Sequence, residues 1–257
     1  MNYPTLSALN SESIVPVSGG RKQPGSGDVA VLVSSAQDFK NIQSNSLKPV
    51  ATSFYLSTLL TDKDKVCFAG PYIGAPYGVV LLESLIAKGF LKILVLGWCG
   101  SVSDKLKVGD LIIPSSAISD EGTSRNYMTS DENFPEIKPS GLLSERLCAK
   151  LDSMDISSVN EKIWTTDAIY RETPEKVDFF KGKGACAVEM ECSALFAAAR
   201  YRNVEIASLL IVSDEITSTA SEKKWTPGFH TKEFKAARKK TCKIISEFAR
   251  ELNQADN

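Results

Sequence analysis

Short apolar runs rich in β-branched residues recur from Val29 onward, separated by segments with helical periodicity. Near-continuous apolar character over four to eight residues is typical of strands that are buried on both faces of a sheet. We expect strands at Val29–Val33, Val66–Ala69, Lys92–Leu96, Asp110–Pro114, Lys162–Thr165, Ala185–Val188 and Glu205–Val212.

The segments between these strands place apolar residues on one face at helical spacing. We expect helices over residues 75–88, 141–151, 193–202 and 231–252, and a short helix that begins at Thr173 and Pro174. Alternating strands and helices favour a central sheet that helices cover on both faces. Ligands in such folds bind at the carboxyl ends of the strands.

The chain has 257 residues, which suits one large α/β domain. Residues 1–27 are rich in Ser, Pro and Gly, so we expect an irregular N-terminal arm followed by one catalytic domain over residues 28–257. The arm has no apolar segment typical of a signal peptide, and no run along the chain is long enough to span a membrane.

Charge and cysteine content narrow the function classes. Lys and Arg total 30 against 31 Asp and Glu, so no basic surface for nucleic acid is indicated. We interpret the basic run at residues 238–240 as a solvated helix face. The six cysteines are scattered without a C-x-x-C pair, so we expect free thiols, no metal site and a reduced, cytoplasmic protein.

Three expected strand ends carry unusual residues. The turn that follows Leu96 contains Gly97, Trp98, Cys99 and Gly100. Glycines there allow backbone N–H groups to approach an anion or a sugar, although a tight turn alone explains them equally well.

The other two strand ends carry acids. Glu189 and Glu191 lie two residues apart where an apolar strand ends and a helix begins, and Asp214 follows a fully apolar strand. Such carboxylates can bind ribose hydroxyls or protonate a leaving group, because buried acids are rare unless they are paired or functional. Alternatively, Glu189 and Glu191 are acids favoured at the start of a helix, and Asp214 is a turn or cap residue.

Taken in order, the segments "GWCGSVSDKLKVGDLIIPSSAISDEGTS" (97–124), "VEMEC" and "VSDEITS" resemble those of the nucleoside phosphorylase superfamily. This superfamily contains purine nucleoside and uridine phosphorylases and nucleosidases, and "LGWCG", "EGTS" and "TTD" are most similar to AMP nucleosidase. The resemblance implies a three-layer αβα domain with a twisted, mostly parallel mixed sheet. It also implies a homo-oligomer, either a dimer, a trimer or a hexamer.

The resemblance assigns roles to individual residues. Glu191 and Met190 match the ribose-binding pair, and Asp214 matches the acid that protonates a purine base. Base-binding positions are Ile169, Tyr170 and Glu189, and the pocket for phosphate or another nucleophile comprises Gly74, Gly97, Trp98, Cys99 and Gly100. We expect a nucleoside or nucleotide ligand, no cofactor, and inorganic phosphate as a possible co-substrate.

Several positions depart from the phosphorylase pattern. A Gly-x-x-x-Arg loop is replaced by "SSAQDFK" (34–40), and Val95 and Trp98 stand where phosphorylases have Arg and Ser or Thr. Thr173 and Glu175 replace the Gln and Arg that read uracil, which favours purines.

The sequence therefore predicts cleavage of the N-glycosidic bond of a purine nucleoside. Phosphorolysis would give free base and ribose 1-phosphate, and hydrolysis by an AMP nucleosidase-like enzyme is the first alternative. A member that binds nucleosides without turnover is the second alternative.

Overall fold

The computed structural model describes residues 11, 13–17, 27–46, 48–218 and 223–255, so most of the expected N-terminal arm lies outside the described residues. The elements are β1 (Val29–Val33), α2 (Ala36–Asn45), β2 (Val50–Phe54), β3 (Ser57–Thr61), β4 (Cys67–Gly70), α3 (Ala75–Ala87), β5 (Lys92–Ser101), β6 (Leu111–Ile112), β7 (Ser116–Asp120), η1 (Ser124–Asn126), β8 (Glu136–Ile137), α4 (Gly141–Ser153), β9 (Lys162–Thr166), η2 (Ile169–Arg171), α5 (Pro174–Gly182), β10 (Ala185–Glu189), α6 (Cys192–Tyr201), β11 (Glu205–Ser218), β12 (Lys223–Pro227) and α7 (Lys232–Ala255).

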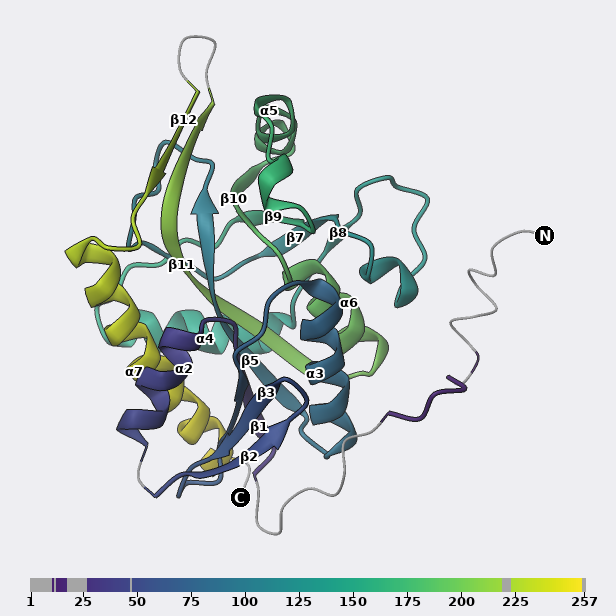
Figure 1. The fold of residues 1–257 in the computed structure, drawn as a ribbon, viewed down its shortest axis with the longest axis vertical. Helices are drawn as coiled ribbons and strands as arrows, with labels where there is room; N and C mark the ends of the chain where they lie inside the picture. The colour runs from purple at the N-terminus through teal and green to yellow at the C-terminus, as the bar shows by residue number, and fades with distance from the viewer. Residues whose placement is uncertain (1–10, 12, 18–26, 47, 219–222, 256–257) are drawn as a thin grey trace.

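The strands of the described chain join into one twelve-stranded mixed sheet. Parallel pairs β4–β1, β1–β5 and β5–β11 form its centre, and antiparallel hairpins such as β2–β3 and β11–β12 extend it. The β11–β12 hairpin projects beyond the body of the domain (Figure 1). The mixed sheet expected from the sequence is therefore confirmed.

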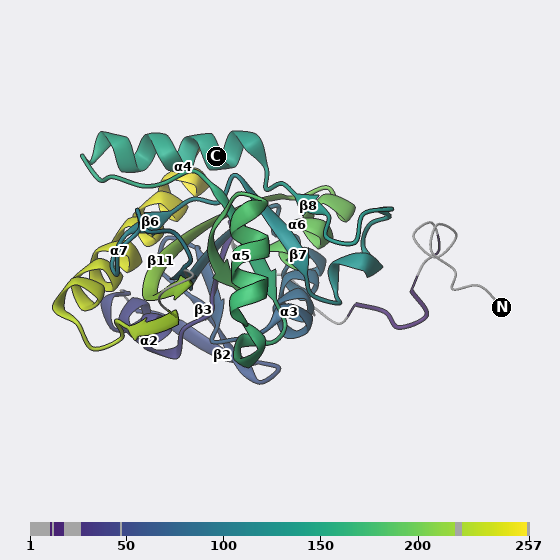
Figure 2. The same ribbon diagram turned by 90° about the horizontal axis from the view of Figure 1, so that it is seen from above.

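Helices cover both faces of this sheet, with α2 and α7 on one side and α3 and α6 on the other (Figures 1 and 2). Alternation along β1 shows the two cores directly: Ala30 and Leu32 pack with α3 and α6, whereas Val29, Val31 and Val33 pack with α7. Because successive side chains of a strand point to opposite faces, an apolar run of this kind requires cover on both sides. The three-layer αβα arrangement is thus confirmed.

Helix α5 packs on a third, smaller cluster near β9 and β10. There the rings of Trp164 and Phe180 stack with centroids 4.4 Å apart. This cluster supports the connection between β9 and α5, which borders the cavity described below.

Some elements differ from the expectation. The strand expected at Asp110–Pro114 shortens to β6, because the Asp110 carboxylate accepts a hydrogen bond from the Lys107 backbone N–H in a turn and Pro114 has no N–H to donate. The segment 34–40, expected as a loop, instead opens helix α2. Ser35 caps this helix by accepting a hydrogen bond from the Asp38 backbone N–H, a Ser-x-x-Asp signal that sequence reasoning passed over.

Short or partly exposed strands were also missed, namely β2, β3, β7, β8 and β12. All six cysteines are free, and Cys67, Cys99 and Cys186 are buried as expected. Within the described residues, no helix is both long and apolar enough to cross a membrane.

The packing of α3 against the sheet yields a stability prediction. Leu82 is fully buried in the core between α3 and α6, whereas Val80 on the same helix is 43% exposed. Leu82→Ala should lower the free energy of unfolding by about 2–5 kcal/mol, because it removes buried methyl groups and leaves a cavity. Val80→Ala, the control, should change it by less than about 0.5 kcal/mol. Urea denaturation measures both, and equal effects would contradict this assignment of the core.

Candidate active site

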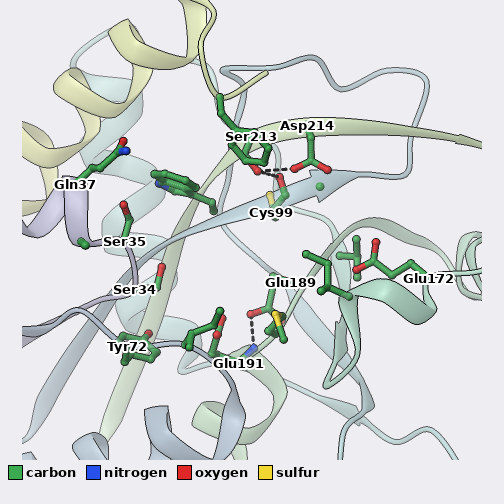
Figure 3. Close-up of a pocket in the computed structure, with 18 residues that line it drawn as sticks. Ser34, Ser35, Gln37, Tyr72, Cys99, Glu172, Glu189, Glu191, Ser213 and Asp214 are labelled. Atoms are coloured by element: carbon green, nitrogen blue, oxygen red, sulfur yellow. Dashed lines mark hydrogen bonds between the residues drawn. The ribbon is translucent and has the colours of Figure 1, made fainter. Parts of the chain in front are cut away.

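A cavity of about 420 Å³ opens where β1, β5, β10 and β11 end. Its lining comes from the β1–α2 turn, the end of β5, the β9–α5 connection, the β10–α6 turn and the end of β11 (Figure 3). Segments far apart in the sequence therefore meet at one edge of the sheet, as expected for this architecture.

The structure brings most of the predicted site residues to this cavity. Those that line it are Trp98, Cys99, Gly100, Ile169, Glu189, Met190, Glu191 and Asp214. Tyr170 does not line it and is 97% exposed. Gly74 and Gly97 lie behind the lining, where the Gly74 backbone N–H reaches Glu191 and Gly97 is close to Ser34.

Gly100 is the point at which three strands converge. It pairs with Asp214 of β11 on one side and with Val188 of β10 on the other. A Cβ atom at this position would lie 3.0 Å from Asp214 Oδ2. A larger residue would therefore displace the Asp214 carboxyl group, which lies close against the strand backbone.

Glu189 is held entirely by the protein. Its carboxylate accepts hydrogen bonds from the Thr165 hydroxyl and from the backbone N–H groups of Glu191 and Cys192, the latter two at 2.8 Å. Both of its oxygens are engaged, so this carboxylate orders the turn between β10 and α6. Its predicted contact with a base stays a prediction.

Glu191 follows in that turn, and its Oε1 accepts a 2.5 Å hydrogen bond from the Gly74 backbone N–H. Gly74 precedes α3 with a φ of 83°, a conformation that favours glycine. Burial and the neighbouring Glu189 carboxylate raise the pKa of Glu191. Because Glu189 receives more hydrogen bonds, we assign the proton of this buried pair to Glu191, which can then both donate to and accept from a hydroxyl.

Asp214 lies across the cavity from these two residues (Figure 3). It accepts hydrogen bonds from Ser213 Oγ at 2.6 Å and from Trp225 Nε1 at 2.8 Å. Trp225 belongs to β12, a strand that the sequence analysis did not predict. The contact between its indole and Asp214 was therefore not predicted either. The two contacts fix the orientation of the carboxyl group.

Comparison with known proteins identifies the family of this chain. The sequence profile of the phosphorylase superfamily matches residues 24–250. The chain belongs to the phosphorylase superfamily.

Individual members of this superfamily are distant in sequence. A guanosine phosphorylase of Halorubrum lacusprofundi is 28% identical over 192 residues, which are 75% of this chain and 76% of the relative. The crystal structure of the purine nucleoside phosphorylase of Toxoplasma gondii in complex with immucillin-H has a TM-score of 0.76 at 16% identity, with 90% and 93% of the two chains covered. An AMP nucleosidase from Bacteroides thetaiotaomicron has a TM-score of 0.72 at 16% identity, with 90% and 91% covered. Both structures have the same fold as this chain.

If Ser34 takes the place of the glycine in the Gly-x-x-x-Arg pattern, the residue at the place of the arginine is Asp38. Asp38 is fully buried, and its carboxylate accepts hydrogen bonds from Trp98 Nε1 at 2.5 Å and Arg238 Nε at 2.7 Å. The Arg238 guanidinium also lies 4.9 Å from the centre of the Trp98 ring. The basic run at residues 238–240 is therefore only partly a solvated face, because Arg238 is held inside by this carboxylate while Lys239 and Lys240 are exposed.

The described residues that line the cavity include acids but no basic side chain. None of the described residues that line it is Lys, Arg or His, and Glu172 joins the three predicted carboxylates there. His230, the one histidine of the chain, does not line it. Across the described residues no group of three or more His, Cys, Asp or Glu is arranged to hold a metal ion.

Sequence reasoning missed Glu172, Asp38, Ser213 and Trp225 as residues of the site or its support. Glu172 and Ser213 each adjoin a quoted motif, so proximity in sequence was the available signal. Asp38 lies within the quoted segment 34–40, but its partners Trp98 and Arg238 are 60 and 200 positions away, so nothing local indicated these contacts. Trp225 gave no signal, because its contact with Asp214 forms only when β12 pairs with β11.

The buried Asp38–Arg238 pair generates a prediction. Asp38→Ala leaves the Arg238 side chain, which is 12% exposed, without its carboxylate partner. We expect the free energy of unfolding to fall by about 3–5 kcal/mol. The double variant Asp38→Ala/Arg238→Met should lose clearly less than the sum of the single variants, because it leaves no uncompensated charge. Denaturant titration of all four proteins measures this, and strict additivity would contradict the coupling.

Proposed function

We propose that this chain cleaves the N-glycosidic bond of purine nucleosides. The observation that carries the proposal is the convergence of Glu191, Met190 and Asp214 on one cavity. The superfamily membership and the name of the guanosine phosphorylase relative support it.

Cleavage of this bond needs a held sugar and a stabilised leaving base. As the base departs, the ribosyl carbon acquires oxocarbenium character. Glu191 binds the ribose hydroxyls, Met190 packs on the sugar, and Asp214 supplies a proton to the departing base. Ser213 and Trp225 keep the Asp214 carboxyl group directed at that base. Ile169 contributes an apolar surface for the ring.

For the attacking group we propose water. A phosphate dianion requires positive or strongly donating partners once it leaves solvent. The described residues that line the cavity offer no cationic side chain, and Arg238 is neutralised by Asp38 behind Trp98. The Glu189 and Asp214 carboxylates that line the cavity repel a dianion, whereas neutral water experiences no such penalty. The products would then be free base and ribose.

Phosphorolysis is the second candidate, and the start of α2 favours it. Ser34, Ser35 and Gln37 line the same cavity at the amino end of this ten-residue helix. Helix amino ends attract anions through free N–H groups and the helix dipole. Inorganic phosphate would then be the co-substrate, and a neighbouring copy in a dimer, trimer or hexamer would have to supply the missing cation.

The role of Asp214 is tested by Asp214→Asn. Turnover of the best purine nucleoside should fall by about 10²–10⁴-fold, the usual contribution of a general acid. The matched control is Asp104→Asn, which removes an exposed carboxylate just beyond β5. Steady-state kinetics and circular dichroism measure activity and folding. Unchanged turnover in a folded Asp214→Asn protein would remove Asp214 from the reaction.

The attacking group is tested by removing phosphate enzymatically and identifying the sugar product. Hydrolysis predicts free ribose at a rate that does not change when phosphate is absent. Phosphate-dependent formation of ribose 1-phosphate would establish phosphorolysis instead. If a purine and pyrimidine panel gives neither product, catalysis itself is contradicted.

A further inference from the structure

A groove of about 570 Å³ runs between α2 and α7, which lie side by side on one face of the sheet (Figures 1 and 2). Among the described residues, none lines both this groove and the candidate active site. Asn41, Ile42 and Asn45 line it from α2, and a stripe of α7 from Ala236 to Arg250 lines it from the other side. The stripe is about 21 Å long, and a volume of this size suits a small organic ligand.

One wall of the groove is basic, because Lys239, Lys240 and Lys243 project from about one turn of α7. Within the described part of the chain, Lys239 and Lys240 have no ion-pair partner. Lys243 lies 3.7 Å from Glu247 in an exposed pair of a kind that contributes little. Like charges three and four residues apart on a helix repel each other. An anion bound among these three ammonium groups would relieve that repulsion.

The other charged groups around the groove leave this basic wall uncompensated. Arg250 closes one end, where Asp62 binds it at 2.9 Å and Asp64 at 3.2 Å, so its charge is already matched. Glu247 is the one acid among the described lining residues. The only acid of α2 is Asp38, which is fully buried. The groove is therefore positively charged, in contrast with the acidic cavity.

The floor of the groove is apolar. Ile42 is 3% exposed and Cys242 is 3% exposed, and both line the groove. Asn41 and Asn45 add amide groups along the α2 side. A matching ligand therefore combines an apolar or aromatic body with several negative charges. A single phosphate group carries about two negative charges at neutral pH, fewer than the lysines offer, so linked phosphates match the wall better.

We propose that the groove between α2 and α7 binds a ligand with two or more linked phosphate groups on an aromatic or apolar body, the chemistry of a nucleoside di- or triphosphate. The phosphates bind Lys239, Lys240 and Lys243, which act as point charges, and the body lies on Ile42 and Cys242. This site is separate from the proposed cleavage of nucleosides and does not depend on it.

Isothermal titration calorimetry with tripolyphosphate and with ATP tests the proposal. Wild type should bind both, and ATP more tightly, because only ATP has a body that contacts the floor. The variant Lys239→Gln/Lys240→Gln/Lys243→Gln should weaken binding of both by about 10–100-fold, the loss of three exposed charge contacts. Tripolyphosphate has no nucleoside part, so its binding separates this groove from the candidate active site.

Two controls locate the effect. Lys105→Gln/Lys232→Gln/Lys235→Gln removes the same charge from exposed lysines outside the groove and should leave binding within about twofold of wild type. At Ala236, an exposed lining residue of α7, Ala236→Glu should weaken binding of tripolyphosphate, whereas the neutral Ala236→Gln should weaken it much less. Equal losses in the two lysine variants, or equal effects of the two substitutions at Ala236, overturn the proposal.

The remaining outcomes distinguish other occupants of the groove. Binding of ATP but not of tripolyphosphate would show recognition of the nucleoside part alone and overturns the proposal. An acidic peptide that binds more tightly than ATP would assign the groove to a protein partner, and a lower mass of the groove-lysine variant in light scattering would assign it to a second copy of the chain. Either result overturns the proposal. Turnover of purine nucleosides without polyphosphate should be unchanged in this variant, so failure of the cleavage activity is measured separately.

Discussion

The close approach of β10 and β11 to the backbone of Gly100 is the constraint on which the site depends. β5 pairs with β11 over most of its length and with β10 at its last residues, so one strand positions the acids of both neighbours. With no side chain at Gly100, Asp214 can lie against this strand and face the Glu189–Glu191 turn. A side chain there would contact the Asp214 carboxyl group and shift it from this position.

A second requirement is that the buried carboxylates accept hydrogen bonds from nearby donor groups. Glu189 receives the Thr165 hydroxyl, and Thr165 in turn accepts the backbone N–H of Ser193. The Ser193 hydroxyl donates at 3.0 Å to Glu121, a second buried carboxylate. Glu121 of the "EGTS" segment thus supports the start of α6, and with it Glu191, without reaching the cavity. Because unpaired buried charges are costly, such a network specifies one arrangement of the turn.

The negative charge of the cavity results from the positions of the cationic side chains around it. Arg238 pairs with Asp38, Lys176 with Asp120, and neither lines the cavity. The acids inside it therefore meet no cationic side chain among the described lining residues, which favours neutral sugars and bases over dianions. The same arrangement leaves Glu172 half-buried near Asp214, the condition under which a carboxyl group titrates near neutral pH.

The sequence alone determined the buried strands, the long amphipathic helices and the superfamily, because each depends on local apolar periodicity or on motif order. Asp214, Glu191 and Met190 were predicted in this way, since each adjoins a strand end with a recognisable motif, and the structure places all three on one cavity. Tertiary structure decided what no local pattern encodes. Trp225 reaches Asp214 only when β12 folds back on β11, and Asp38 meets Trp98 and Arg238 across 60 and 200 positions of sequence. Long-range pairing of polar groups is a property of packing, and for that reason the electrostatics of the cavity could not be predicted from the chain.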